Sequence, residues 1–117
     1  MKYIKTSLIV FTLMFLASCG NSNPSITHIV VKSDSIGVLL DTDDSSTLKA
    51  LGKIFYEKEE MPDEGPEFKF FVDITIDGAT TRWQYSEDGF IRNFEIPHSM
   101  IYGLKDPAEF NRTANIR

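Results

Sequence analysis

Two Asp-Gly pairs, Asp77-Gly78 and Asp88-Gly89, limit the folds open to this chain more than any other feature. Each pair stands between segments in which apolar and polar residues alternate, and Asp-Gly favours the two-residue type I′ turn of a β-hairpin. Counting outward from the first turn places Val72 opposite Trp83. Counting from the second places Trp83 opposite Phe94. The two pairs therefore predict one three-stranded antiparallel meander.

The two predicted registers agree on which side chains share a face of this meander. One face carries the rows Val72–Trp83–Phe94, Ile74–Thr81–Ile96 and Phe70–Tyr85–Arg92. The opposite face carries Asp73–Arg82–Glu95 and Phe71–Gln84–Asn93. An antiparallel sheet commonly buries one face and exposes the other to water, so we expect the first, mainly apolar set to face the core.

The segment before the meander predicts a hairpin and a helix. Residues 26–33 and 36–41 are rich in β-branched and aliphatic residues, and Asp34-Ser35 between them is typical of a turn. Oxygens of residues 44–46 can cap a helix that begins near Thr47. Its apolar residues recur at helical spacing: Leu48, Leu51, Ile54 and Phe55. The proline-containing loop 61–66 ends this helix.

A second, short helix is predicted near the end of the chain. Asp106 occupies the capping position, Pro107 the first helical position, and Glu109 can return to the cap amide. Phe110 should then face inward. The complete prediction is an α+β fold, in which a hairpin, a helix, a three-stranded meander and a C-terminal helix form an antiparallel sheet with helices on one face.

The first nineteen residues contain a targeting signal. Lys2 and Lys5 precede an apolar run over 8–16 that is too short to cross a bilayer, as in a secretory signal peptide. The run ends in Leu16-Ala17-Ser18-Cys19, which resembles the lipobox of bacterial lipoproteins. An ordinary signal peptide with a chance cysteine, or an uncleaved anchor, is the alternative interpretation.

The resemblance implies a lipid anchor on Cys19. Cleavage would follow Ser18, and Cys19 would carry diacylglyceryl and further fatty acyl chains such as palmitate, since one chain anchors only marginally. The chain then divides into a signal peptide (1–18), a lipidated tether (19–25) and one α+β domain (26–117). Gly20 stands where an aspartate would resemble an inner-membrane retention signal, so the outer membrane of a bacterial envelope is slightly favoured.

Charge and cysteine content narrow the classes of function. The formal net charge is −5, and loss of Lys2 and Lys5 with the signal peptide makes it −7. An acidic domain favours neither nucleic acid nor anionic lipid headgroups. Cys19 is the one cysteine of the chain, so its acylation leaves no thiol for a disulfide, a metal or a nucleophile. We expect no cofactor.

The sequence contains no complete signature of a metal or catalytic site. Asp41-Thr42-Asp43-Asp44 resembles the start of a calcium loop, but Ser46 and Gly52 replace the required glycine and closing glutamate, so a helix-capping turn is the favoured interpretation. His28 and His98 lack companions at zinc-ligand spacing. We therefore predict no metal site. No nucleophile elbow or phosphate loop is present in the sequence, and no catalytic residue is assigned.

The predicted exposed sheet face is the candidate partner surface. It carries Asp73, Arg82 and Glu95, together with Phe71 and Ile91, two apolar residues on an otherwise polar face. For the three charged residues alone, a surface ion-pair row without a binding role is the favoured interpretation. Either a partner protein or the C-terminal tail (Met100, Ile101, Tyr102) could cover those two. We expect a non-enzymatic, protein-binding or inhibitory module held on a membrane by its N-terminal lipid, with an envelope protein as partner. A structural component of an envelope complex is the alternative.

Overall fold

The computed structural model describes residues 23–62 and 65–117. The predicted signal peptide, the lipidation site Cys19 and the first part of the tether lie outside the described residues. Within them, no helix is both long and apolar enough to cross a membrane.

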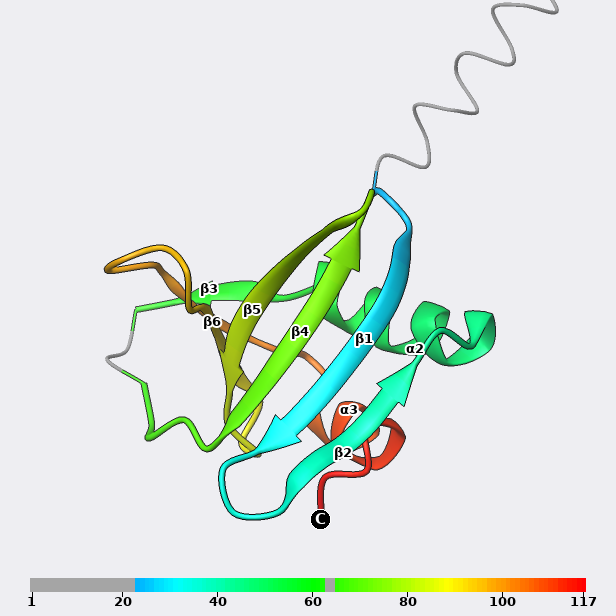
Figure 1. The fold of residues 1–117 in the computed structure, drawn as a ribbon. Helices are drawn as coiled ribbons and strands as arrows, with labels where there is room; N and C mark the ends of the chain where they lie inside the picture. Colours follow the sequence, from blue (N-terminus) through cyan, green and yellow to red (C-terminus); the bar gives the residue numbers. More distant parts are fainter. Residues whose placement is uncertain (1–22, 63–64) are drawn as a thin grey trace, which may run out of the picture.

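The described chain forms one antiparallel sheet of seven strands with two helices, which confirms the α+β prediction. The elements follow one another as β1 (Ile26–Ser33), β2 (Gly37–Thr42), α2 (Ser45–Tyr56), β3 (Glu59–Met61), β4 (Phe70–Ile76), β5 (Ala79–Tyr85), β6 (Phe90–Asn93), β7 (Ile101–Gly103) and α3 (Pro107–Thr113). Across the sheet the strand order is β2-β1-β4-β5-β6-β7-β3 (Figure 1). Both helices lie behind the sheet in this view, so one face is covered.

Both helices begin where capping side chains place them. The Asp44 carboxylate accepts a hydrogen bond from the Thr47 amide at 3.0 Å, and Asp106 accepts one from the Glu109 amide at 3.2 Å. Pro107 occupies the first turn of α3, where its missing N–H costs nothing. These contacts confirm the two predicted helix starts.

The core lies between the covered sheet face and the helices. It contains Ile29 and Val31 from β1, Val72 and Ile74 from β4, Tyr85 from β5, Leu48, Leu51 and Phe55 from α2, and Phe110 from α3. Trp83 packs edge-on against Phe55, with ring centroids 5.0 Å apart. Phe110 is 2 % exposed, so its predicted inward orientation is confirmed.

The register across the first Asp-Gly turn is as predicted. Asp77 and Gly78 have φ angles of 51° and 80°, as a type I′ turn requires. Val72 therefore pairs with Trp83, and Asp73 with Arg82.

The register across the second Asp-Gly turn was predicted wrongly by one residue. Trp83 pairs with Asn93, not with Phe94, and Tyr85 pairs with Ile91, not with Arg92. The turn is a three-residue loop, because the Ser86 amide donates to the Phe90 carbonyl at 2.9 Å. Gly89 alone supplies a positive φ, at 95°, which is the geometry of a type I turn followed by a left-handed residue.

A one-residue shift exchanges the two faces of a strand. Ile91, placed on the exposed face by the sequence, is fully buried in the core at 0 % exposure. Phe94 and Ile96, expected in the core, are 51 % and 56 % exposed beyond the end of β6.

Two short strands were not predicted. Residues 101–103 form β7 between β6 and β3, so this segment extends the sheet at its edge and does not lie across its face. β3 occupies residues 59–61, directly after α2, where only a loop was expected from residue 61. Both strands are three residues long, so neither shows an alternating pattern in the sequence.

Candidate functional site: the outer face of the sheet

We call the sheet face turned away from α2 and α3 the outer face. Its central part is formed by alternate residues of β1, β4 and β5, which point away from the core because side chains alternate along a strand. Phe94 and Glu95, which follow β6, extend it. The outer face includes Lys32, Phe71, Asp73, Arg82, Gln84, Arg92, Phe94 and Glu95.

Asp73 and Arg82 form a two-pronged ion pair at the centre of the outer face. The Arg82 Nε and Nη2 atoms donate to the two Asp73 carboxylate oxygens at 2.8 and 3.0 Å. The Asp73 side chain is 13 % exposed, and Lys32 Nζ lies 3.7 Å from its second oxygen. The hydrogen bond from Arg82, aided by the charges of both cations, holds the pKa of Asp73 below its ordinary value.

The Glu95 side chain is linked to this row by a hydrogen bond from the Arg82 backbone. The Arg82 amide donates to Glu95 Oε2 at 2.9 Å, and the Phe94 amide donates to the Arg82 carbonyl at 3.0 Å. The turn after β6 is thus fastened to β5 on both sides of Arg82. The sequence placed Asp73, Arg82 and Glu95 together, and the structure brings them together.

An aromatic pair adjoins the charged row. Phe71 and Phe94 pack edge to face with centroids 5.4 Å apart. The Arg82 guanidinium carbon lies 4.9 Å from the centre of the Phe71 ring, within cation–π range. Phe71 is partly exposed and Phe94 is 51 % exposed. The Arg82 guanidinium and the two phenyl rings therefore form one continuous surface. Asp73 fixes the guanidinium, and the surface is open to solvent.

A second arginine–aromatic contact lies towards the β6 edge. Arg92 donates from Nε and Nη2 to Gln84 Oε1 at 3.2 and 2.7 Å, and its guanidinium carbon lies 4.9 Å from the Phe68 ring centre. Phe68 lies just before β4, and its ring covers the part of the outer face around Arg92. The open part of the outer face is centred on Phe71.

The sequence named four of the residues on this surface and misplaced one. Phe71, Asp73, Arg82 and Glu95 lie together, whereas Ile91 belongs to the core. Phe94 and Arg92 are outer-face residues that the sequence assigned to the core face, because the assumed two-residue turn shifted this strand by one residue. Nothing in the Asp88-Gly89 dipeptide itself distinguishes the two loop lengths.

The acidic turn before α2 is used for capping and pairing. Asp44 accepts hydrogen bonds from the side chains of Ser46 and Thr47 as well as the Thr47 amide, and these bonds lower its pKa. Asp41 accepts a hydrogen bond from His28 at 2.6 Å across the β1–β2 pair. Among the described residues no three histidine, cysteine or acidic side chains converge on a possible metal position.

The outer face offers recognition chemistry more readily than proton transfer. Asp73 is held in its charged form by Arg82, which makes it a poor base. Arg82 is charged at physiological pH like any arginine, and Asp73 raises its pKa further. No known protein family matches the chain, and neither a curated protein nor a solved structure is significantly similar to it.

Proposed function

We propose that this protein is a lipid-anchored, non-enzymatic binding module of a bacterial envelope, and that its outer face captures another envelope protein. The observation that carries the proposal is the partly exposed pair Phe71–Phe94 with Arg82 stacked on it. Aromatic residues and arginine are enriched at protein interfaces, and the few residues that carry most of the binding energy lie at central, well-packed positions.

The surface is organised before any partner arrives. Arg82 is fixed by two hydrogen bonds to Asp73, and the turn carrying Phe94 is fixed to the Arg82 backbone. A side chain already held in its bound conformation loses little entropy on binding, which favours affinity.

The expected lipid on Cys19 supports the same role. Anchoring confines the domain and a membrane partner to one surface, which raises their effective concentration without any new contact. A modest interface on the outer face would then suffice. The same anchor also suits a structural component of an envelope complex, which is the second candidate.

Crosslinking in the native envelope tests the proposal. A photo-crosslinking amino acid replaces Phe94, and a matched one replaces Ile36, which is 74 % exposed in the β1–β2 turn. We expect one discrete crosslinked product from position 94 that disappears when Phe71→Ala is added, and none of the same mass from position 36. Mass spectrometry then names the partner.

Three outcomes test separate parts of the proposal. Equal crosslinking from positions 94 and 36 would exclude the outer face as the specific site. Stoichiometric co-purification with membrane-complex subunits, independent of Phe71, would favour the structural role. Cys19→Ser should leave an unprocessed precursor without lipid, and recovery of a processed, acylated protein from that variant would refute the anchor.

A further inference from the structure

Three aromatic rings surround the ammonium group of Lys58. Its Nζ atom lies 3.9 Å from the ring centre of Phe55, 5.3 Å from that of Trp83 and 5.2 Å from that of Tyr102. All three distances are within the range of about 6 Å over which an aromatic face attracts a cation. The rings come from α2, β5 and β7, so elements far apart in the sequence converge on one cation. We call Phe55, Trp83 and Tyr102 the aromatic cage.

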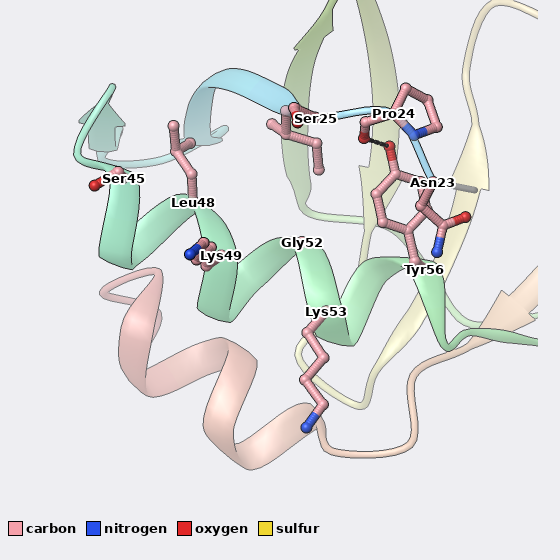
Figure 2. A pocket seen from close by; sticks show the side chains of 10 residues that line it. Asn23, Pro24, Ser25, Ser45, Leu48, Lys49, Gly52, Lys53 and Tyr56 are labelled. Carbon is pink, nitrogen blue, oxygen red and sulfur yellow. Dashed lines mark hydrogen bonds between the residues drawn. The ribbon is translucent and has the colours of Figure 1, made fainter. Parts of the chain in front are cut away.

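Contacts among the rings and their neighbours fix the walls of the aromatic cage. The Phe55 ring, 5 % exposed, packs edge-on against Trp83, and the ring centres of Trp83 and Tyr102 lie 6.5 Å apart. Tyr56, next to Phe55, fastens the end of α2 to the incoming chain, because its hydroxyl donates to the Pro24 carbonyl at 2.6 Å (Figure 2). The rings are therefore positioned by the fold itself.

Lys58 occupies the aromatic cage without a countercharge. No described carboxylate forms an ion pair with it, and the adjacent Glu59 pairs instead with Lys105 at 3.4 Å. Burial lowers the pKa of Lys58, because the ammonium group is partly desolvated. Its three N–H donors gain little from the ring faces, since N–H···π contacts are weak hydrogen bonds. Lys58 is thus held by the rings alone, and its flexible four-carbon side chain can leave the cage without a change in the backbone.

A quaternary ammonium group suits the aromatic cage better than a lysine does. Such a group has no N–H donor, so it needs neither a carboxylate nor a carbonyl partner, and proteins recognise it with cages of aromatic rings. The ring centres of Trp83 and Tyr102 lie 5.3 and 5.2 Å from the lysine nitrogen, which leaves space for methyl groups. Lys58, Trp83 and Tyr102 are each partly exposed, so the cage is open to solvent.

We propose that the aromatic cage binds a quaternary ammonium group, and that Lys58 occupies the cage as an internal competitor while this ligand is absent. The ligand is a soluble choline-type cation or the choline headgroup of a lipid. Binding moves the Lys58 side chain into solvent and leaves the rings in place. The cage lies on the helix-covered side of the sheet, so the proposal is independent of the outer face and of the lipid on Cys19.

Tryptophan fluorescence tests this proposal, because Trp83 is the one tryptophan of the chain and therefore reports on the cage directly. The purified full-length protein in maltoside detergent is titrated with tetramethylammonium chloride, and with sodium chloride as the control for ionic strength. We expect a saturable change in emission with tetramethylammonium alone. Lys58→Gln should strengthen this binding roughly five- to thirtyfold, because it removes the competitor. Lys53→Gln removes the same charge from an exposed position of α2 and should leave the affinity unchanged.

A change in the rings gives a second, independent test. Tyr102→Leu removes one wall of the cage and should weaken tetramethylammonium binding roughly tenfold, measured in the Lys58→Gln background. Phe71→Leu removes a ring that contacts Arg82 on the outer face and should not affect it. Free choline and dodecylphosphocholine micelles then distinguish the two sources of the ligand. A response to free choline assigns a soluble cation, and a response to the micelles at concentrations where free choline gives none assigns a lipid headgroup.

Three results would overturn the proposal. The first is the absence of a saturable response in both the wild type and Lys58→Gln, which would make Lys58 a purely structural residue. The second is equal affinity of these two proteins, since a competitor must weaken binding. The third is a response that Tyr102→Leu retains in full, because the ligand would then lie outside the aromatic cage.

Discussion

Arg82 joins Asp73 to the aromatic surface: one guanidinium donates two hydrogen bonds to the Asp73 carboxylate and lies 4.9 Å from the Phe71 ring centre. The charged row and the apolar pair on the outer face are therefore one unit. A change at Asp73 should act on stability directly and on partner binding through the orientation of Arg82.

Asp73→Asn should lower the free energy of unfolding by about 1 kcal/mol at pH 7, because it replaces a charge-assisted pair by a neutral hydrogen bond. The pKa of Asp73 is lower in the folded protein than in the unfolded chain. The stabilisation that ionised Asp73 gives to the folded protein is therefore complete above the unfolded-state pKa. It is lost as the pH falls through the folded-state pKa. Urea titrations of both proteins between pH 7 and pH 2 should converge at the acidic end.

Asp34→Asn is the matched control for this measurement. Asp34 lies exposed in the β1–β2 turn, away from the arginine pair. Its replacement should leave the acid dependence of stability almost unchanged. A difference between wild type and Asp73→Asn that stays constant down to pH 2 would show that the loss is one of packing and not of charge.

The register across the second turn predicts opposite consequences for two neighbouring apolar residues. Ile91→Ala should cost about 2–5 kcal/mol in unfolding free energy, since the Ile91 side chain is 0 % exposed and its removal leaves a cavity in the core. Phe94→Ala should cost less than about 1 kcal/mol, because the ring is 51 % exposed. Chemical denaturation measures both losses. A larger loss for Phe94→Ala than for Ile91→Ala would support the two-residue turn that the sequence predicts.

The sequence predicted correctly those features that depend on residues close together in the chain. The Asp77-Gly78 turn has the backbone angles that its dipeptide favours, and the Asp44 cap begins α2 where its side chain can accept an amide. The second turn differs because it is held by distant residues. The Gly89 carbonyl accepts a hydrogen bond from the Leu104 amide at 2.8 Å, and Pro107 packs against the glycine.

The candidate site was predictable to the same extent. Asp73 and Arg82 lie across the first hairpin, whose register follows from its own turn, so their pairing could be foreseen. Phe94 and Ile91 depend on the second turn, and their faces were therefore exchanged. The close approach of α2 to β1 depends on the packing of Ile26 against Gly52, residues 26 positions apart in sequence, and no pattern in either segment predicts it.

The buried hydroxyl group of Ser86 allows the cost of an unpaired polar group to be measured. Ser86 is 4 % exposed, and its Oγ atom has no hydrogen-bond partner among the described residues. A buried polar group left unpaired costs about 1–3 kcal/mol, so Ser86→Ala should be neutral or stabilising by up to about 1 kcal/mol. Thermal denaturation followed by circular dichroism measures the change.

Ser33→Ala is the control for Ser86→Ala. Ser33 is 9 % exposed, and its Oγ atom accepts a hydrogen bond from the Ser35 amide at 3.3 Å. Its loss should cost about 1 kcal/mol. If both alanine variants are destabilised equally, a bound water satisfies Ser86.

The glycines of the two Asp-Gly turns differ in their surroundings and not in the sign of φ. Gly78 and Gly89 both have positive φ, at 80° and 95°. A Cβ on Gly78 would meet no atom within 4 Å, whereas one on Gly89 would lie 2.7 Å from Pro107 Cβ. Gly78→Ala should therefore cost only the backbone strain of about 1–2 kcal/mol.

Gly89→Ala should cost about 1–3 kcal/mol more than Gly78→Ala, since overpacking against Pro107 adds to the same strain. Urea unfolding of the two variants isolates the packing contribution, because the backbone contribution is common to both. Equal losses would mean that α3 can move away from the turn without cost. The larger loss at Gly89 would show that the start of α3 holds the three-residue loop, and through it the register that buries Ile91 and exposes Phe94.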